Sequence, residues 1–117
     1  MIIKNEPFVS AVLPHLQMSE QLVVDRCSLR NLIDFLRKSY SVDNDSGEHI
    51  YQAGLEAAYI SESNPTSIIL FELQQYIQDA QDMLKSTDSE AHELAQMYIT
   101  SALDMCKKIR KSVKTYI

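Results

Sequence analysis

Hydrophobic residues recur at helical spacing along most of the chain, and the pattern is clearest near its C-terminal end. Between Thr87 and Ile117 nearly every step from one apolar position to the next is three or four residues. This spacing predicts one long amphipathic helix over 87–117 with a broad buried stripe. The stripe consists of Leu94, Ala95, Tyr98, Ala102, Met105, Ile109, Val113 and Tyr116. Thr87 followed by Glu90 matches a capping box and marks the start of this helix.

A second apolar stripe predicts a helix from about Ser19, its candidate cap, to Tyr40. The residues that share this face are Leu22, Leu29, Ile33, Leu36 and Tyr40. The run Leu22-Val23-Val24 is the one stretch here that leans toward a strand. The opposite face carries Arg26, Arg30 and Arg37, at offsets of four and seven residues.

The stretch from Ser41 to Gly47 is rich in Asp, Asn, Ser and Gly, and it predicts a loop. A helix then extends from a cap at Asp45 or Ser46 to about Glu62. Its small side chains, which let a neighbouring helix approach closely, are Ala53, Gly54, Ala57 and Ala58. A glycine inside a helix costs roughly 1 kcal/mol relative to alanine, and close packing would offset that cost.

The segment Ser63-Asn64-Pro65 is typical of a helix start, because a capping side chain precedes a proline. The predicted helix extends to about Lys85, and its apolar stripe is Ile69, Leu73, Tyr76, Ile77, Ala80, Met83 and Leu84. A similar start at Asn5 and Pro7 predicts a short N-terminal helix that Pro14 ends. We expect that short helix to lie over the others as a lid.

These elements predict an all-α fold in a single domain over residues 1–117. We expect a largely antiparallel bundle of four main helices plus the short N-terminal helix, because the loops are short. The chain has 117 residues, 45% of them hydrophobic, which suits one domain with its own core. Two glycines and three prolines are too few for the many turns of a strand-rich fold.

Charge and cysteine content limit the binding partners and the cellular compartment that we expect for the protein. A net charge of −5 and a pI of about 5.1 argue against a general nucleic-acid binder, although a local basic face remains compatible. We interpret Cys27 and Cys106 as small core residues in a reducing compartment. Neither a signal segment nor an apolar run long enough to span a membrane is evident in the sequence. We therefore expect a cytoplasmic protein with no membrane partner.

The sequence offers few residues for catalysis or metal binding. No Glu is followed three residues later by His, which is the pair that di-iron bundles need. The loop after Asp43 lacks the Gly and Glu positions of an EF-hand. Cys106 lies in an apolar stripe, where core packing is the simpler interpretation. We therefore expect no catalytic residue, no metal and no cofactor; an enzyme built on Cys27 or a histidine is the least favoured alternative.

The candidate binding surface is the basic end of the C-terminal helix, formed by Lys107, Lys108, Arg110, Lys111 and Lys114. One interpretation is a solvated helix end stabilised by the helix dipole. The other is a contact surface for an acidic protein or for phosphate. On a helical projection Lys108 points away from the other four. Those four would join the arginines of the 19–40 helix if the two helices were neighbours, which spacing alone does not determine.

The C-terminal helix is also apolar over a wide arc, because Met97, Ile99, Leu103 and Cys106 flank its main stripe. Six tyrosines and five methionines suit an adaptable contact surface as well as a core. This apolar surplus predicts self-association, most simply as a two-fold homodimer.

The function that these patterns predict is that of a small non-enzymatic accessory or regulatory protein. It would act by binding another protein, as an adaptor, inhibitor or chaperone. The alternative is a nucleic-acid-binding regulator that uses the basic C-terminal helix, and salt-dependent binding to DNA or RNA would distinguish the two.

Overall fold

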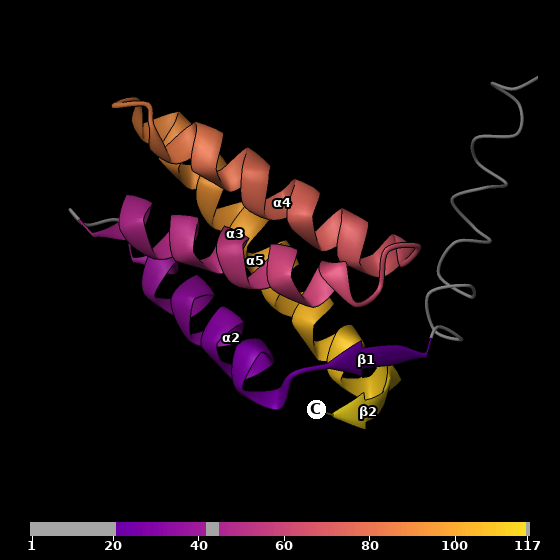
Figure 1. Ribbon diagram of the computed structural model, residues 1–117. Coiled ribbons are helices and arrows are strands. Elements are labelled where there is room, and N and C mark those ends of the chain that lie inside the picture. Colours follow the sequence, from indigo (N-terminus) through magenta and orange to yellow (C-terminus); the bar gives the residue numbers. More distant parts are fainter. Residues whose placement is uncertain (1–20, 42–44, 117) are drawn as a thin grey trace, which may run out of the picture.

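The computed structural model describes residues 21–41 and 45–116, and this part of the chain is mostly helical (Figure 1). Its elements in order are strand β1 (Leu22–Val24), helices α2 (Arg26–Tyr40), α3 (Ser46–Glu62), α4 (Ile68–Leu84) and α5 (Ser89–Ser112), and strand β2 (Val113–Tyr116). The all-α class is therefore confirmed, with the addition of a short two-stranded parallel sheet that was not predicted. The short N-terminal helix was predicted for residues that lie outside the described ones.

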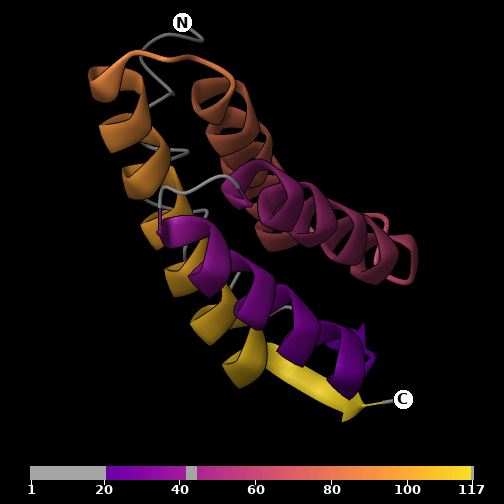
Figure 2. The ribbon, with the colours of Figure 1, turned by 90° about the vertical axis from the view of Figure 1, so that its left-hand side faces the viewer.

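The four helices pack in a closed order, because α2 contacts α3, α3 contacts α4, α4 contacts α5, and α5 contacts α2. Figure 2 shows α3 and α4 together on one side of the molecule and α2 with α5 on the other. Helix α2 lies along α5 from Gln96 to Arg110. At one end the Gln96 side-chain amide donates to the Tyr40 carbonyl at 3.2 Å, and at the other end Arg110 lines a groove together with residues of α2. This arrangement makes α2 and α5 direct neighbours.

One continuous apolar core lies between the helices and takes residues from β1 and from all four of them. Helix α3 contributes small side chains, since Ala53 and Ala57 are fully buried along with Ile50 and Ile60. Predicted core positions near helix ends differ from the expectation: Tyr40, Leu94 and Tyr116 are exposed. Ile99 and Cys106, predicted as apolar surplus, are instead buried in the core.

Helix α2 begins at Arg26 and not near Ser19 as the stripe predicted. Asp25 is its cap, and the Asp25 carboxylate accepts from the Cys27 amide at 2.9 Å. Before it, β1 alternates, because Leu22 and Val24 are buried and Val23 is exposed. The run Leu22-Val23-Val24 is therefore a strand. Its two buried residues still pack in the core, as the predicted helix required of Leu22.

The observed starts of α4 and α5 also differ by a few residues from the predicted ones. Ser67 caps α4, and its hydroxyl accepts from the Leu70 amide at 3.2 Å, so α4 begins after the predicted Ser63-Asn64-Pro65 start. Asp88 caps α5 in place of Thr87, and its carboxylate accepts from the Glu90 amide at 3.1 Å. In both cases a neighbouring residue supplies the capping oxygen.

The prediction of a helix up to Ile117 was wrong, because α5 ends at Ser112 and the chain continues as β2. β2 pairs in parallel with β1, and the partners are Leu22 with Val113, Val23 with Thr115 and Val24 with Tyr116. Val113, Thr115 and Tyr116 suit a strand as well as their spacing suits a helix. The pairing with a strand from the other end of the described chain decides between the two.

Asn64 holds β1 from the α3–α4 connection. Its side-chain oxygen accepts from the Val23 amide at 3.0 Å, and its side-chain nitrogen donates to the Val23 carbonyl at 2.8 Å and to the Ile60 carbonyl at 3.0 Å. One amide side chain thus pairs with both backbone groups of Val23, as a neighbouring strand would.

We expect Asn64→Ala to destabilise the protein by about 1–2 kcal/mol, because it removes these hydrogen bonds from β1. Urea unfolding measures the loss, and Ser63→Ala on the same connection is the matched control. A free energy of unfolding for Asn64→Ala equal to that of Ser63→Ala would mean that Asn64 does not anchor the strand.

Gly54 meets only the tip of a flexible side chain. A Cβ at this position would lie 2.7 Å from Gln81 Nε2 and 3.7 Å from Ile77 Cγ2. The Gln81 amide donates to the Ile50 carbonyl across a long 3.4 Å, so little is lost when this side chain moves. The neighbouring helix backbone therefore does not require a glycine here.

We expect Gly54→Ala to stabilise the protein by up to about 1 kcal/mol, because alanine favours the helix and Gln81 can move aside. Thermal unfolding measures this change. Gly47→Ala is the control, since a Cβ at Gly47 meets nothing within 4 Å. A loss of stability for Gly54→Ala alone would show that the α3–α4 distance depends on the glycine.

Candidate functional site

A groove of about 620 Å³ lies where α2 passes the C-terminal end of α5 and β2. Its lining residues are Arg26, Leu29, Arg30, Asn31, Ile33, Asp34, Arg37, Arg110 and Tyr116. We call it the arginine groove. Four of its lining residues are arginines, three from α2 and one from α5.

Helical geometry explains how the arginines come together. Arg26, Arg30 and Arg37 follow one another at offsets of four and seven, so they share one face of α2. The apolar stripe of α2 faces the core and turns this face outward. Packing of α2 against α5 then brings Arg110 to the same groove.

The floor and one end of the groove are apolar. Leu29 and Ile33 are buried beneath the charged side chains. At the β2 end the Arg26 guanidinium lies over the Tyr116 ring, 4.6 Å from its centroid, which is a cation–π contact. Arg30 donates from Nη2 to Cys27 Sγ at 3.4 Å, a contact that leaves its charge uncompensated.

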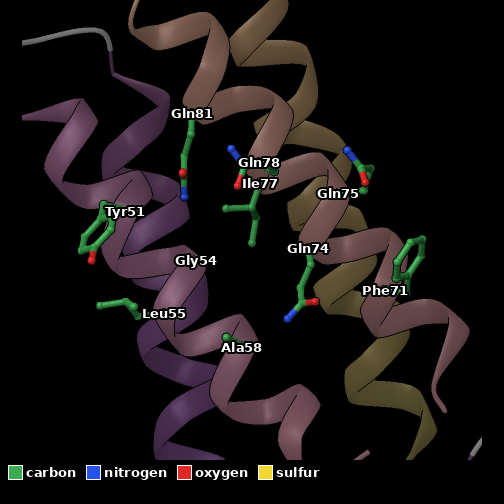
Figure 3. A pocket seen from close by; sticks show the side chains of 10 residues that line it. All are labelled: Tyr51, Gly54, Leu55, Ala58, Phe71, Gln74, Gln75, Ile77, Gln78 and Gln81. Carbon is green, nitrogen blue, oxygen red and sulfur yellow. The ribbon is translucent and has the colours of Figure 1, made fainter. Parts of the chain in front are cut away.

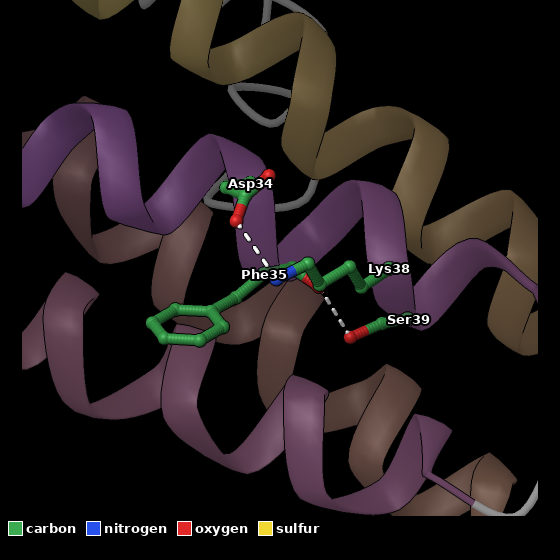
Figure 4. A network of polar contacts seen from close by, with 4 residues as sticks. All are labelled: Asp34, Phe35, Lys38 and Ser39. Carbon is green, nitrogen blue, oxygen red and sulfur yellow. Dashed lines mark hydrogen bonds and ion pairs between the residues drawn. The ribbon is translucent and has the colours of Figure 1, made fainter.

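One carboxylate lines the groove, and it pairs along its own helix. Asp34 contacts Lys38 Nζ at 3.1 Å, and both side chains are more than half exposed (Figure 4). The same turn holds Ser39, which donates to the Phe35 carbonyl at 2.7 Å. Within the described residues no ion pair involves any of the four groove arginines. A ligand with carboxylates or phosphates therefore meets guanidinium groups whose charge no carboxylate of the described residues neutralises.

The five predicted site residues lie in different surroundings in the structure. Arg110 lines the arginine groove, while Lys108 lies with Asp104 and Tyr76 in a separate hollow on the α4 side. The remaining three, Lys107, Lys111 and Lys114, are exposed. Of the five predicted residues, Arg110 alone lines the arginine groove, where it joins the three arginines of α2.

Positive charge is concentrated on one helix pair, α2 and α5, whereas acids lie on both pairs. Apart from Lys85, every lysine and arginine in the described residues belongs to α2 or to the stretch 107–114. Residues 46–84, which contain α3 and α4, hold no lysine or arginine at all. The acids of that stretch are Glu48, Glu56, Glu62, Glu72, Asp79 and Asp82. A chain with net negative charge thus presents a basic side at α2 and the end of α5.

The two thiols differ in reactivity. Cys106 is buried in the core, and this burial raises the pKa of its thiol to about 12, with nearby Arg110 as a smaller opposing influence. Its thiol therefore stays protonated at neutral pH and is a poor nucleophile. Cys27 is exposed at the start of α2.

The two histidines of the described part differ in their contacts, because His92 has a hydrogen-bonding partner whereas His49 packs on a ring and its buried Nδ1 has no hydrogen-bond partner among the described residues. The His49 ring stacks on Phe35 with centroids 6.5 Å apart, and the His92 ring nitrogen Nε2 contacts the Ser86 carbonyl. No group of three His, Cys, Asp or Glu side chains in the described residues is placed to hold a metal ion. Among the helices of residues 21–41 and 45–116, none has the length and apolar character needed to cross a membrane.

Sequence reasoning missed the role of Tyr116 and left open whether the two basic helices are neighbours. Tyr116 was assigned to the core because it continues the helical stripe, but β2 places its ring beneath Arg26. The spacing of the α2 arginines was a visible signal. Their proximity to Arg110 depends on tertiary packing.

Comparison with known proteins gives no relative: no family model, no curated protein and no solved structure matches this chain. The argument on function therefore depends on the groove and on the distribution of charge.

We expect iodoacetamide at about pH 8 to modify Cys27 quickly in the folded protein and to leave Cys106 unmodified, because Cys27 is exposed, whereas burial makes Cys106 inaccessible and raises the pKa of its thiol. Intact-mass spectrometry counts the modified thiols. Cys27→Ser should remain unlabelled until urea unfolds it. Rapid labelling of folded Cys27→Ser would contradict the burial of Cys106.

Proposed function

We propose that the protein is a non-enzymatic accessory protein that acts by binding another protein, and that the arginine groove holds an acidic segment of that partner. The observation that supports this proposal best is the convergence of Arg26, Arg30 and Arg37 with Arg110 from a second helix. Guanidinium groups bind carboxylates with two parallel hydrogen bonds, and a rigid helical frame reduces the entropy lost on binding.

The chemistry of the groove favours a peptide over a bare polyanion. Leu29 and Ile33 form an apolar floor, and Tyr116 adds an aromatic wall. Asp34 would repel a closely placed phosphate but leaves room for spaced carboxylates. A segment with Asp or Glu alternating with apolar residues satisfies both features of the groove.

Nucleic acid is the second candidate. Its support is three exposed lysines close in sequence to Arg110, namely Lys107 and Lys111 of α5 and Lys114 of β2, whose charge adds to that of the groove arginines toward a phosphate backbone. The net charge of −5 opposes long-range attraction of a polyanion. We therefore place this function after protein binding.

The setting that we propose is a cytoplasmic, single-domain protein with a largely antiparallel helical bundle. Free thiols at Cys27 and Cys106 support a reducing compartment. The two-fold homodimer stays a prediction, and the exposed apolar residues that α5 offers for it are Leu94 and Met97. An adaptor, inhibitor or chaperone role depends on the partner.

The test compares two fluorescent probes: a peptide of about 12 residues with alternating Glu and Leu, long enough to follow α2, and a single-stranded DNA oligonucleotide. We expect the peptide to bind, and Arg30→Gln with Arg110→Gln to weaken it about tenfold, because two charge-assisted contacts are lost. Lys85→Gln, which removes a cation on the far side of the molecule, is the matched control. Fluorescence anisotropy measures both affinities.

A peptide with Gln in place of Glu should bind poorly, since it lacks the carboxylates. Tighter binding of the oligonucleotide, with a salt dependence that falls by about two when both arginines are removed, would favour the nucleic-acid function. Equal effects of the arginine variants and Lys85→Gln on both probes would reject the groove as the binding site.

A further inference from the structure

A second groove, of about 390 Å³, lies between α3 and α4 (Figure 3), the two helices that contain no lysine or arginine. Its apolar lining comes from Tyr51, Leu55 and Ala58 of α3 and from Phe71 of α4. Glutamines of α4 form the opposite wall, with Gln81 above Gly54 (Figure 3). We call it the α3–α4 groove.

The apolar side chains of this groove are exposed to a degree that a core does not explain. Phe71 is 67% exposed, Tyr51 56% and Leu55 49%. Tyr59, one turn beyond Leu55 on α3, is 51% exposed and lengthens the stripe. A contiguous set of large exposed apolar residues marks an interaction surface more often than a solvated one.

Acids do not line the groove, but both helices carry them near it. Glu48 precedes Tyr51 by three residues and Glu62 follows it by eleven, so both lie on the same face of α3 at its two ends. On α4, Asp82 accepts from Gln78 Nε2 at 3.2 Å, and Asp79 accepts from Gln75 Nε2 at 3.2 Å. These bonds leave the negative charges of both carboxylates in place beside the groove.

We infer that the α3–α4 groove binds an amphipathic helix of a partner protein, with apolar residues along its buried face and lysine or arginine on both sides of that face. A helix laid on an apolar groove is a common mode of recognition, and its anchors repeat every three or four residues, as Tyr51, Leu55 and Tyr59 do. The acids on both helices select basic flanks on the partner.

A second copy of the chain fits this groove less well. Its basic side is the arginine groove, which is itself hollow, and two hollows do not fill one another. A separate helix is convex and supplies the apolar ridge that the α3–α4 groove lacks. This inference concerns a different face from the arginine groove and does not depend on the function proposed for it.

The experiment uses a fluorescein-labelled helical peptide of about 18 residues, which spans roughly 27 Å. Its leucines follow one another at alternating spacings of three and four residues, so that they share one face of the helix. Lysines lie on both sides of that face. The control peptide keeps the leucines and carries glutamate in place of lysine. We expect the lysine peptide to bind the full chain at least about tenfold more tightly than the glutamate peptide, and more weakly as salt is raised.

Variants of the protein test whether the peptide binds in the α3–α4 groove. Leu55→Ser and Phe71→Ser should each weaken binding about fivefold or more, because each removes an exposed apolar anchor. Met97→Ser is the matched control, since Met97 is 63% exposed on α5 and lies outside the groove. Glu62→Gln with Asp82→Asn should reduce the salt dependence, while Glu90→Gln with Glu93→Gln on α5 should not. Unchanged unfolding temperatures show that these surface variants remain folded.

Three results would overturn the inference. The first is equal binding of both peptides, or binding of neither. The second is an effect of Met97→Ser as large as that of Phe71→Ser. The third is self-association of the wild-type chain in sedimentation that Phe71→Ser abolishes, since the groove would then hold a second copy. Arg30→Gln with Arg110→Gln should leave the lysine peptide unaffected, which separates this test from that of the arginine groove.

Discussion

The pairing of β1 with β2 is the constraint on which the arrangement of this molecule depends. α2 starts directly after β1 and α5 ends directly before β2, so two paired strands place two distant helices side by side. The register sets Val24 opposite Tyr116 and thereby brings the Tyr116 ring to Arg26. The arginine groove lies beside this pairing, where direct packing of α2 on α5 brings Arg110 to the α2 arginines and β2 adds Tyr116.

The core explains why the other helix pair has an apolar exterior. The inner face of α3 is built around Ala53 and Ala57, which allow close contact with neighbouring helices. Ile50 and Ile60 complete this inner face, while three other large apolar side chains, Tyr51, Leu55 and Tyr59, are exposed. Helix α3 thus carries apolar residues on both faces, and helical periodicity alone does not show which of them the core buries.

The sequence alone predicted that the four helices exist, but not every residue at which they begin and end. Periodic stripes predicted all four described helices, because each helix must bury one face. Val113 and Tyr116 continue the spacing of Ile109, so local pattern favoured helix where non-local pairing makes a strand. For the site, the spacing of Arg26, Arg30 and Arg37 was readable, whereas their meeting with Arg110 is a tertiary fact. The α3–α4 groove went unpredicted for the same reason, since it depends on which apolar residues the core leaves outside.

The strand pairing also has a consequence for the order in which the chain acquires its structure during synthesis. β1 leaves the ribosome before the helices, and β2 follows after all of them, so the sheet closes the longest loop of the described chain. Asn64 is made between the two strands and can occupy the backbone of Val23 while β2 is still absent. The finished structure keeps these bonds beside the β1–β2 pairing, so Asn64 gives the strand a hydrogen-bonding neighbour both before and after β2 arrives, and the Val23 backbone is not open to another chain.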